Sequence, residues 1–276
     1  MNTNIQLCDM HIHSRNSHDA KSSVSEIARI CIEKGISRFA VTDHCDVEYF
    51  VRDNVPGVIK NSVEETENTA KDFVGKVEIL RGIEIGEGIW NAAHTAEILA
   101  SHRYDVVISS VHAVRYKNYS DPYAQLDFSA LSEQELDGFI NKYFDELYEM
   151  LHTVPCDIMA HLTCPFRYIN GKYALGKNTY DYREKILPIL EYAIKSSVAM
   201  EINTSGIYSA LGDFMPDEWV LKDFLKMGGH LITLGSDAHI AQNAGGGLHE
   251  AIELLKKHGV NKYYYYKERK PVECRI

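Results

Sequence analysis

The sequence predicts an α/β protein in which a parallel sheet closes into a barrel with helices outside. Apolar, strand-like runs alternate with helical patterns about seven times, which is typical of a parallel sheet covered by helices. Polar side chains follow nearly every run, and in a closed barrel the carboxyl ends of all strands meet at one mouth. An open doubly wound sheet gathers its polar residues at one crevice and does not need one from every strand.

The first half of the chain contains four of these runs. They are residues 5–11, 36–41, 77–85 and 106–111. A helical period covers residues 23–34, with Ser23 as N-cap and Gly35 as the stop, and a second covers residues 92–100. Residues 61–74 are polar with widely spaced apolar positions, which indicates a solvated outer helix.

The second half continues the alternation. Its predicted strands are residues 156–160, 198–202 and 230–234, and its predicted helices are residues 132–152, 182–196, 217–227 and 248–258. The first of these helices has the strongest start, because Ser132 is followed three residues later by Glu135, a capping box. Residues 115–129 and 162–179 carry no clear period and are interpreted as loops, and an aromatic run at 263–266 precedes a charged tail.

Length and composition indicate an ordinary globular protein. A chain of 276 residues buries a sizeable core, and because no linker divides it we predict a single domain over 1–276. The net charge of -10 argues against nucleic acid or an anionic membrane as the main partner. No apolar run approaches the roughly 20 residues of a membrane span. Nothing in the sequence fixes the oligomeric state.

The cysteines and the N-terminus favour an intracellular protein. The six cysteines show no CxxC spacing, and several lie in apolar runs, which favours buried structural thiols over a disulfide framework. Residues 1–4 contain neither a basic segment nor a signal-like apolar core. A cytoplasmic location is therefore the expectation.

Polar residues at the ends of the predicted strands form the candidate site. They are His11, His44, Glu84, His112, His161, Asn203 and Asp237. Two of them belong to pairs spaced by two residues, His11 with His13 and Asp237 with His239, and this spacing directs both side chains to one side of a strand. Imidazole and carboxylate donors without thiolates suit Zn, Mn or Fe, and there are enough donors for two or three ions.

A structural role is the alternative for each residue taken alone, since a single histidine at a strand end is more often a hydrogen-bonded structural residue. The set favours ligands, because a barrel mouth that buried so many imidazoles and carboxylates without charge partners would be costly. Other histidines, including His18 and His94, lie in predicted loops or helices and are interpreted as surface or core residues.

Ordered motifs along the whole chain resemble the polymerase and histidinol phosphatase (PHP) family. The motifs are Asp9-Met10-His11-Ile12-His13-Ser14, Ser17, Asp19, Thr42-Asp43-His44, Gly82-Ile83-Glu84, Ser110-Val111-His112, Ala160-His161-Leu162 and Gly235-Ser236-Asp237-Ala238-His239. The segment 201–206 is similar to the histidinol-phosphatase branch in particular.

The resemblance implies a distorted (β/α)7, TIM-like barrel of the PHP type with a trinuclear metal site. The implied ligands of the first metal are His11, His13, Glu84 and Asp237. Glu84 would bridge to a second metal held also by His112 and His161, and Asp19, His44 and His239 would hold a third. Ser14, Asp43 and Ser236 are candidates for orienting the ligand rings.

The implied reaction is phosphomonoester hydrolysis. A metal-bridging hydroxide would attack phosphorus in line, and the metal ions would offset the acidic character of the protein at the site. Besides Glu84 as the bridge, Asp237 and His239 are the candidate catalytic residues, since either is placed to protonate the leaving alkoxide.

Substrate contacts are expected from Arg167, Asn203 and Tyr208. Arg167 lies six residues after His161, and an arginine fork matches phosphate oxygens. Relatives often carry Thr-Ser-Gly-Leu-Arg where this chain has Thr204-Ser205-Gly206-Ile207-Tyr208. Tyr208 therefore replaces a basic residue.

The leading hypothesis is hydrolysis of L-histidinol phosphate in histidine biosynthesis. A PHP-type phosphoesterase acting on another small phosphate ester, on nucleotides or on oligonucleotides is one alternative, although an extended basic groove is missing from the sequence. A non-catalytic metal-binding domain is another, although such a domain should have lost ligands.

Overall fold

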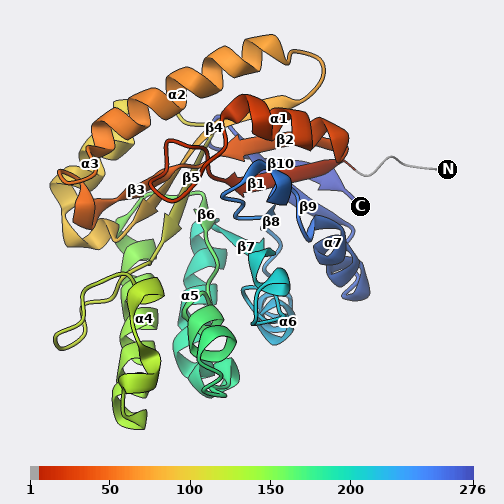
Figure 1. Cartoon of the computed structure of the whole chain (residues 1–276). Helices are drawn as coiled ribbons and strands as arrows, with labels where there is room; N and C mark the ends of the chain where they lie inside the picture. Colours follow the sequence, from red (N-terminus) through yellow and green to blue (C-terminus); the bar gives the residue numbers. More distant parts are fainter. Residues whose placement is uncertain (1–5) are drawn as a thin grey trace.

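The fold is a parallel barrel, seen in a computed structural model that describes residues 6–276 (Figure 1). The strands follow one another in chain order around the sheet: β1 (Leu7–Ile12), β2 (Ile36–Val41), β4 (Glu78–Gly86), β5 (Val106–Ser110), β6 (Ile158–Met159), β7 (Ala199–Asn203) and β8 (Ile232–Gly235). A short strand, β3 (His44–Asp46), also pairs in parallel with β4.

The first and last strands of this order meet at a seam that closes the sheet. Ile12 forms an isolated parallel bridge with Ala238. The His13 amide donates to the Ala238 carbonyl at 2.9 Å, and the Asp237 amide donates to the His11 carbonyl at 2.8 Å. The predicted fold class, a distorted TIM-like barrel, is confirmed, and the seam lies among candidate ligands.

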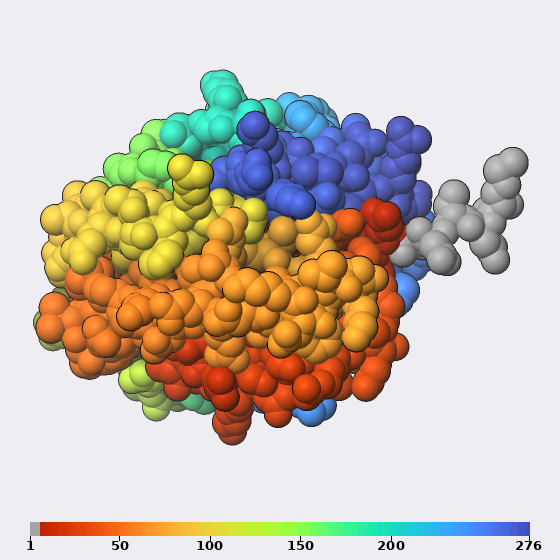
Figure 2. Space-filling view, turned by 90° about the horizontal axis from the view of Figure 1, so that it is seen from above, coloured from red at the N-terminus to blue at the C-terminus, as the bar shows by residue number. Residues whose placement is uncertain are grey.

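The helices surround the sheet (Figure 1). They are α1 (Val24–Glu33), α2 (Val55–Asp72), α3 (Ala92–Ser101), α4 (Glu133–Thr153), α5 (Arg183–Ser196), α6 (Glu218–Lys226) and α7 (Leu248–Lys257). The predicted caps are confirmed: Ser23 with Glu26 and Ser132 with Glu135 each form a capping box. In Figure 2 the segment around α2 and α3, orange to yellow, covers the face toward the viewer beside the C-terminal region in blue.

One hydrophobic core lies between sheet and helices. Its buried side chains run from Leu7 in β1 to Cys274 near the C-terminus. Burial of this apolar surface is the main force that holds the helices on the sheet. The boundaries 1–276 of the predicted single domain stay a prediction.

Several predicted elements differ from the structure. Helix α2 begins at Val55, six residues before its prediction, and β3 was not predicted. The segment 115–129 is not a purely polar loop, because it contains two 3-10 turns with buried Tyr123 and Phe128. Ile5, the first residue of the first predicted strand, lies outside the described residues.

Two further elements also went unpredicted. The segment 162–179 contains a π-helix, Arg167–Lys172. The aromatic run is β9 (Lys262–Lys267), which pairs with β10 (Lys270–Arg275) in an antiparallel hairpin. The Tyr263 hydroxyl anchors this hairpin beside β1, where it donates to the Gln6 carbonyl at 2.6 Å. Within residues 6–276, no helix has both the length and the apolar character needed to cross a membrane.

Candidate metal centre

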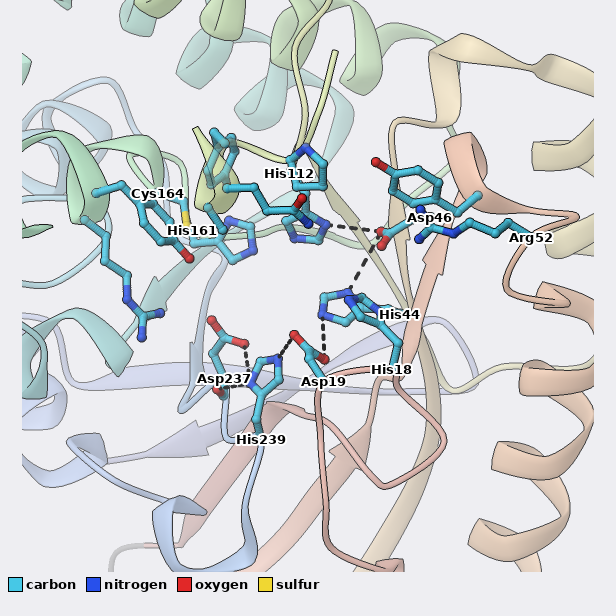
Figure 3. A pocket seen from close by; sticks show the side chains of 17 residues that line it. His18, Asp19, His44, Asp46, Arg52, His112, His161, Cys164, Asp237 and His239 are labelled. Carbon is cyan, nitrogen blue, oxygen red and sulfur yellow. Dashed lines mark hydrogen bonds and ion pairs between the residues drawn. The ribbon is translucent and has the colours of Figure 1, made fainter. Parts of the chain in front are cut away.

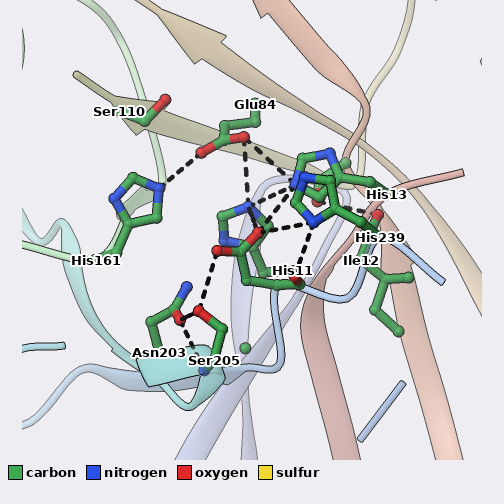
Figure 4. A network of polar contacts seen from close by, with 12 residues as sticks. His11, Ile12, His13, Glu84, Ser110, His161, Asn203, Ser205 and His239 are labelled. Atoms are coloured by element: carbon green, nitrogen blue, oxygen red, sulfur yellow. Dashed lines mark hydrogen bonds and ion pairs between the residues drawn. The ribbon is translucent and has the colours of Figure 1, made fainter. Parts of the chain in front are cut away.

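The nine predicted ligands converge at the carboxyl ends of the strands (Figure 3), with His11, His13 and Glu84 drawn in Figure 4. They come from the end of β1 and the loop after it, the start of β3, the end of β4, and the turns after β5, β6 and β8. Because these segments end at the same side of the barrel, residues more than 200 positions apart in the chain, such as His11 and His239, lie in one cluster.

Glu84 lies at the centre of the cluster and is fully buried. Its Oε2 atom faces His11 Nε2 at 3.4 Å and His13 Nε2 at 3.5 Å. Its Oε1 atom faces His161 Nε2 at 3.0 Å and His112 Nε2 at 3.3 Å. Figure 4 shows His161 on one side of this carboxylate and His11 and His13 on the other. Glu84 is therefore placed to bridge two groups of donors.

The donors form three groups. The first group combines His11, His13 and Glu84 Oε2 with Asp237, whose Oδ1 lies 3.3 Å from His13 Nε2. The second group consists of Glu84 Oε1, His112 and His161. In the third, Asp19 lies between two imidazoles, with Oδ1 3.7 Å from His44 Nε2 and Oδ2 3.2 Å from His239 Nε2 (Figure 3).

Hydrogen bonds on the outer side of the rings set their tautomers. Carboxylates only accept, so His11 Nδ1 carries a proton that it donates to Glu201 Oε1 at 2.7 Å. His112 Nδ1 likewise faces Asp46 Oδ1 at 3.2 Å. The Ser17 hydroxyl donates to Asp43 at 2.9 Å and accepts from His13 Nδ1 at 3.2 Å. Each of these rings thus keeps its Nδ1 proton on the outer side and turns Nε2 toward the centre, where it is the nitrogen free to bind a metal once its proton has left.

The cluster fits divalent cations. His11 Nε2 and His13 Nε2 lie 3.1 Å apart, so two lone pairs would face each other when both rings are in the metal-binding state. Buried Glu84 Oε2 and His44 Nδ1 lie 2.9 Å apart without the geometry of a hydrogen bond, and His161 Nδ1 also lacks a hydrogen-bond partner in the described chain. Unpaired buried polar atoms are costly, and a cation among these nitrogen and oxygen donors removes much of that cost.

The pKa values of the cluster show how its buried charges are balanced without metal. Burial alone would raise the pKa of Glu84, but the charges of His11, His112 and His44 hold it well below its usual range. Burial would lower the pKa of His44, but Glu84 and Asp46 raise it to about 9. Without metal, the carboxylates are thus balanced by protonated imidazoles.

Two candidate ligands have backbones in the left-handed region. His161 has φ +23° and Asp237 has φ +51°. Such conformations are uncommon for residues other than glycine and cost roughly 1–3 kcal/mol each. The turns after β6 and β8 thus hold strained conformations that direct these two side chains into the cluster.

A cavity of about 420 Å³ opens above the donors. Beyond the ligands, its walls include Arg52, Tyr123, Gln125, Arg167 and Tyr168. A second cavity of about 550 Å³ continues on the other side of Arg167, Asp237 and His239.

The predicted substrate residues occupy different positions. Arg167 is mostly buried, donates from Nη1 to Ser205 Oγ at 3.1 Å, and lines both cavities. Asn203 is buried and accepts from Ser205 through Oδ1 at 2.7 Å. Tyr208 is 68% exposed in the second cavity, and its hydroxyl donates to Glu250 at 3.1 Å. Of the three, Arg167 alone lines the first cavity together with predicted ligands.

Of the three residues predicted to orient rings, Asp43 does so through Ser17. Asp43 also accepts from the Ser14 amide and hydroxyl, at 2.6 and 2.7 Å, so Ser14 helps to hold this carboxylate. The Ser236 hydroxyl is buried and has no partner in the described chain.

Sequence reasoning missed Asp46, Glu201 and His18. His18 was interpreted as a surface or core residue, but it lines the first cavity. Asp46 follows His44 by two residues, and Glu201 precedes Asn203 by two, so the spacing that identified His11 and His13 was present at both positions.

Comparison with known proteins identifies the family. The PHP domain matches residues 9–205 of the sequence. The chain belongs to the PHP family.

Relatives of this PHP protein are similar over nearly their whole length. A probable histidinol-phosphatase of Thermotoga maritima is 30% identical over 251 residues, covering 91% of this chain and 92% of that protein. The histidinol-phosphatase of Lactococcus lactis is 26% identical and covers 92% of each. A metal-dependent phosphatase is the enzyme class that these matches support.

The fold agrees with a solved structure. The Lactococcus lactis histidinol phosphate phosphatase, crystallised with zinc, L-histidinol and phosphate, has a TM-score of 0.77 at 22% identity, covering 97% of this chain and 99% of that one. A putative histidinol phosphatase of Listeria monocytogenes has a TM-score of 0.72, covering 88% of this chain. This PHP protein therefore has the fold of those enzymes.

Proposed function

We propose that the protein hydrolyses L-histidinol phosphate to histidinol and phosphate. The observation that carries the proposal is the position of Arg167 in the same cavity as the three donor groups. A planar guanidinium matches two phosphate oxygens, so an ester phosphate between Arg167 and the donor groups would be held from both sides.

The three donor groups would hold two or three divalent ions. Nitrogen and oxygen donors without thiolates suit Zn, Mn or Fe. When bound, such ions neutralise a phosphate dianion and supply a nucleophile by lowering the pKa of water. Glu84, between the first and second groups, would be shared by two of them.

The two candidate general acids differ in charge. Burial would raise the pKa of Asp237, but His11, His13 and His239 hold it well below its usual range, so Asp237 stays ionised. Burial would lower the pKa of His239, but Asp19 and Asp237 raise it. His239 is thus the better proton donor of the two in the absence of metal, and the ionised Asp237 suits a ligand.

The cavity suits a small ester with a flat leaving group. Tyr49, Tyr123 and Tyr168 line its wall, and Gln125 adds an amide. Aromatic walls stack on planar rings, and the imidazole of histidinol is such a ring. The names of the relatives from Thermotoga maritima and Lactococcus lactis support the same substrate.

Another small phosphate ester is the second candidate. The second cavity continues past Arg167 and leaves room for a larger leaving group. Tyr208, at the position where relatives often carry arginine, presents a neutral side chain there.

An assay panel tests the substrate. The purified protein, loaded with Mn or Zn, is incubated with L-histidinol phosphate, an aryl phosphate and short oligonucleotides, and released phosphate or cleaved strands are measured. We expect the highest kcat/KM for L-histidinol phosphate. A higher kcat/KM for any other substrate of the panel contradicts the proposal, and cleavage of oligonucleotides alone overturns the phosphomonoesterase assignment as well.

Arg167→Ala tests the phosphate contact. Loss of a charge-assisted contact to phosphate should lower kcat/KM about 100-fold. Lys172→Ala is the matched control, because Lys172 ends the same π-helix but lines neither cavity. Equal activity of the two variants would show that Arg167 does not contact the phosphate of the substrate.

A further inference from the structure

Glu201 on β7 is a buried carboxylate in contact with two donor groups. Its exposed fraction is 1%. Oε1 accepts from His11 Nδ1 at 2.7 Å, and Oε2 accepts from the His161 amide at 2.7 Å and from Asn203 Nδ2 at 3.2 Å. His11 belongs to the first group and His161 to the second, so one side chain contacts both sides of the Glu84 bridge.

A carboxylate is the side chain that these contacts require. All three partners of Glu201 are donors, and a carboxylate accepts at both oxygens. A glutamine at this position would turn its NH₂ group toward His11 or toward the His161 amide, and would lose one of the two contacts. The negative charge also strengthens both hydrogen bonds.

The contact with His11 fixes the state of the ring. With its proton held at Nδ1, the His11 ring directs Nε2 toward Glu84 Oε2, 3.4 Å away, and Asp237 Oδ1, 3.7 Å away. Histidine ligands commonly depend on such an outer partner for their tautomer and orientation.

The contact with the His161 amide fixes a strained backbone. His161 has φ +23°, which a non-glycine residue adopts only when its surroundings hold it there. Its Nε2 then lies 3.0 Å from Glu84 Oε1. Losing the bond from the amide to Glu201 removes one of the restraints on this turn.

Gly235 on the neighbouring strand β8 makes room for the carboxylate. A Cβ atom at Gly235 would lie 2.2 Å from Glu201 Oε1, far inside van der Waals contact. The same Cβ atom would lie 2.6 Å from His11 Cβ, so a methyl group there would displace both Glu201 and the candidate ligand His11.

We propose that Glu201 is a positioning residue that couples the first and second donor groups. It orients His11 through Oε1 and His161 through Oε2, so both groups depend on one carboxylate. The proposal rests on the metal-dependent site of the proposed function and adds a residue that is not itself a ligand.

The test is zinc binding by Glu201→Gln, with free zinc set by a competing chelator and bound zinc measured by mass spectrometry. Losing an outer partner of a ligand costs about 10- to 100-fold in metal affinity. We expect the affinity for two of the bound zinc ions to fall by that factor in Glu201→Gln. Asp46→Asn changes a residue that faces His112 of the second group at 3.2 Å and His44 of the third at 4.0 Å. The zinc of the first group should therefore keep its affinity in that variant.

Asp157→Asn is the matched control. Asp157 is also buried and accepts an amide from the adjacent strand, Val107 N at 2.8 Å, but at the opposite end of the sheet. Zinc affinity of Glu201→Gln equal to that of Asp157→Asn overturns the proposal. If Glu201→Gln does not fold, Glu201→Asp takes its place, because its shorter side chain keeps the charge but cannot reach both His11 and the His161 amide. Unchanged zinc affinity in that variant overturns the proposal equally.

A spectroscopic readout separates positioning from stability. Long-range ¹H–¹⁵N NMR of the metal-free protein should show His11 protonated at Nδ1 in the wild type, with that signal shifted or lost in Glu201→Gln. An unchanged His11 signal contradicts the proposal. Zinc binding needs no substrate, so the two proposals can fail separately. If the wild type fails the phosphatase panel but Glu201→Gln binds zinc more weakly, the proposed function is refuted and the coupling by Glu201 is supported.

Discussion

The two ends of the barrel balance their carboxylates in different ways. At the amino ends of three strands, acidic residues pair with cations of the protein: Glu78 with Arg38 and Lys267, Asp105 with Arg81, and Asp157 with Arg269. At the carboxyl ends of the same strands, Glu84 faces imidazoles, and within residues 6–276 no lysine or arginine pairs with it.

The contrast separates stability from function within single strands. Strand β4 begins with Glu78, neutralised by two side chains, and carries Glu84 near its end. At the amino end, lysine and arginine side chains neutralise the carboxylate. At the carboxyl end, the carboxylate is neutralised by protonated imidazoles or by metal ions. Changes at the amino ends should therefore affect folding, and changes at the carboxyl ends should affect metal binding and activity.

The largest effect is expected from Glu84→Gln. The substitution removes the charge that faces five imidazoles, so two ions should bind weakly and kcat should fall at least about 1,000-fold. Zinc content and phosphate release measure this. Wild-type kcat in a variant that has lost its zinc would show that the cluster does not catalyse.

The second prediction concerns pH in the metal-free protein. Burial lowers the pKa of His44 in the folded state, but the charges of Glu84 and Asp46 outweigh burial and raise it to about 9. In an unfolded chain the pKa of a histidine is about 6.5. Protonation of His44 therefore stabilises the fold fully below about pH 6.5, and this contribution, about 3 kcal/mol, is lost as pH rises through about 9.

The stability contributed by the amino end of the barrel should be lost at acidic pH. Burial would raise the pKa of Glu78, but Lys267 and Arg38 lower it, so its contribution is present above the unfolded pKa and is lost as the solution becomes acidic. Urea unfolding of chelated protein across pH measures both. Zinc should remove the alkaline loss, because bound imidazoles are already neutral; the same alkaline loss with and without zinc would contradict this explanation.

Asp105→Ala should produce a smaller effect on folding alone. Asp105 accepts from the Arg81 amide at 2.9 Å and the Glu268 amide at 3.1 Å. Leaving these donors unpaired should lower the free energy of unfolding by about 2 kcal/mol, with unchanged kcat for the folded fraction. A drop in kcat at constant stability would mean that the two ends are not separable.

Lys267→Ala should have the smallest effect. Lys267 pairs with Glu78 at 2.7 Å but is half exposed. Exposed pairs contribute about 0–1 kcal/mol, so denaturant unfolding should detect no more than that. A larger loss would show that the charges at this end depend on each other as strongly as those of the cluster.

Most of the barrel could be predicted from the sequence because its strands are apolar runs with clear limits. Strand β2 matches its predicted range, since Gly35 and Thr42 bound the run. Strand β3 and the hairpin of β9 and β10 were missed for the opposite reason. The tyrosines of β9 are buried on successive positions, so no alternation marks a strand.

The candidate ligands could be predicted to lie together, but the contacts of their outer partners could not. Residues at strand ends converge in any closed barrel, so His112 and His161 needed no knowledge of contacts. Asp46 and Glu201 contact the outer nitrogen of an imidazole ring. Which carboxylate reaches that nitrogen is decided only when the neighbouring strands have packed.

The seam between β1 and β8 also sets the order of events during synthesis. The first candidate ligand is residue 11 and the last is residue 239, and the bonds between His11, His13, Asp237 and Ala238 close the barrel. A chain emerging from the ribosome holds His11 and His13 early but gains their partners only after more than 200 further residues. The first donor group is thus incomplete throughout most of translation, and its full affinity for metal arises together with barrel closure.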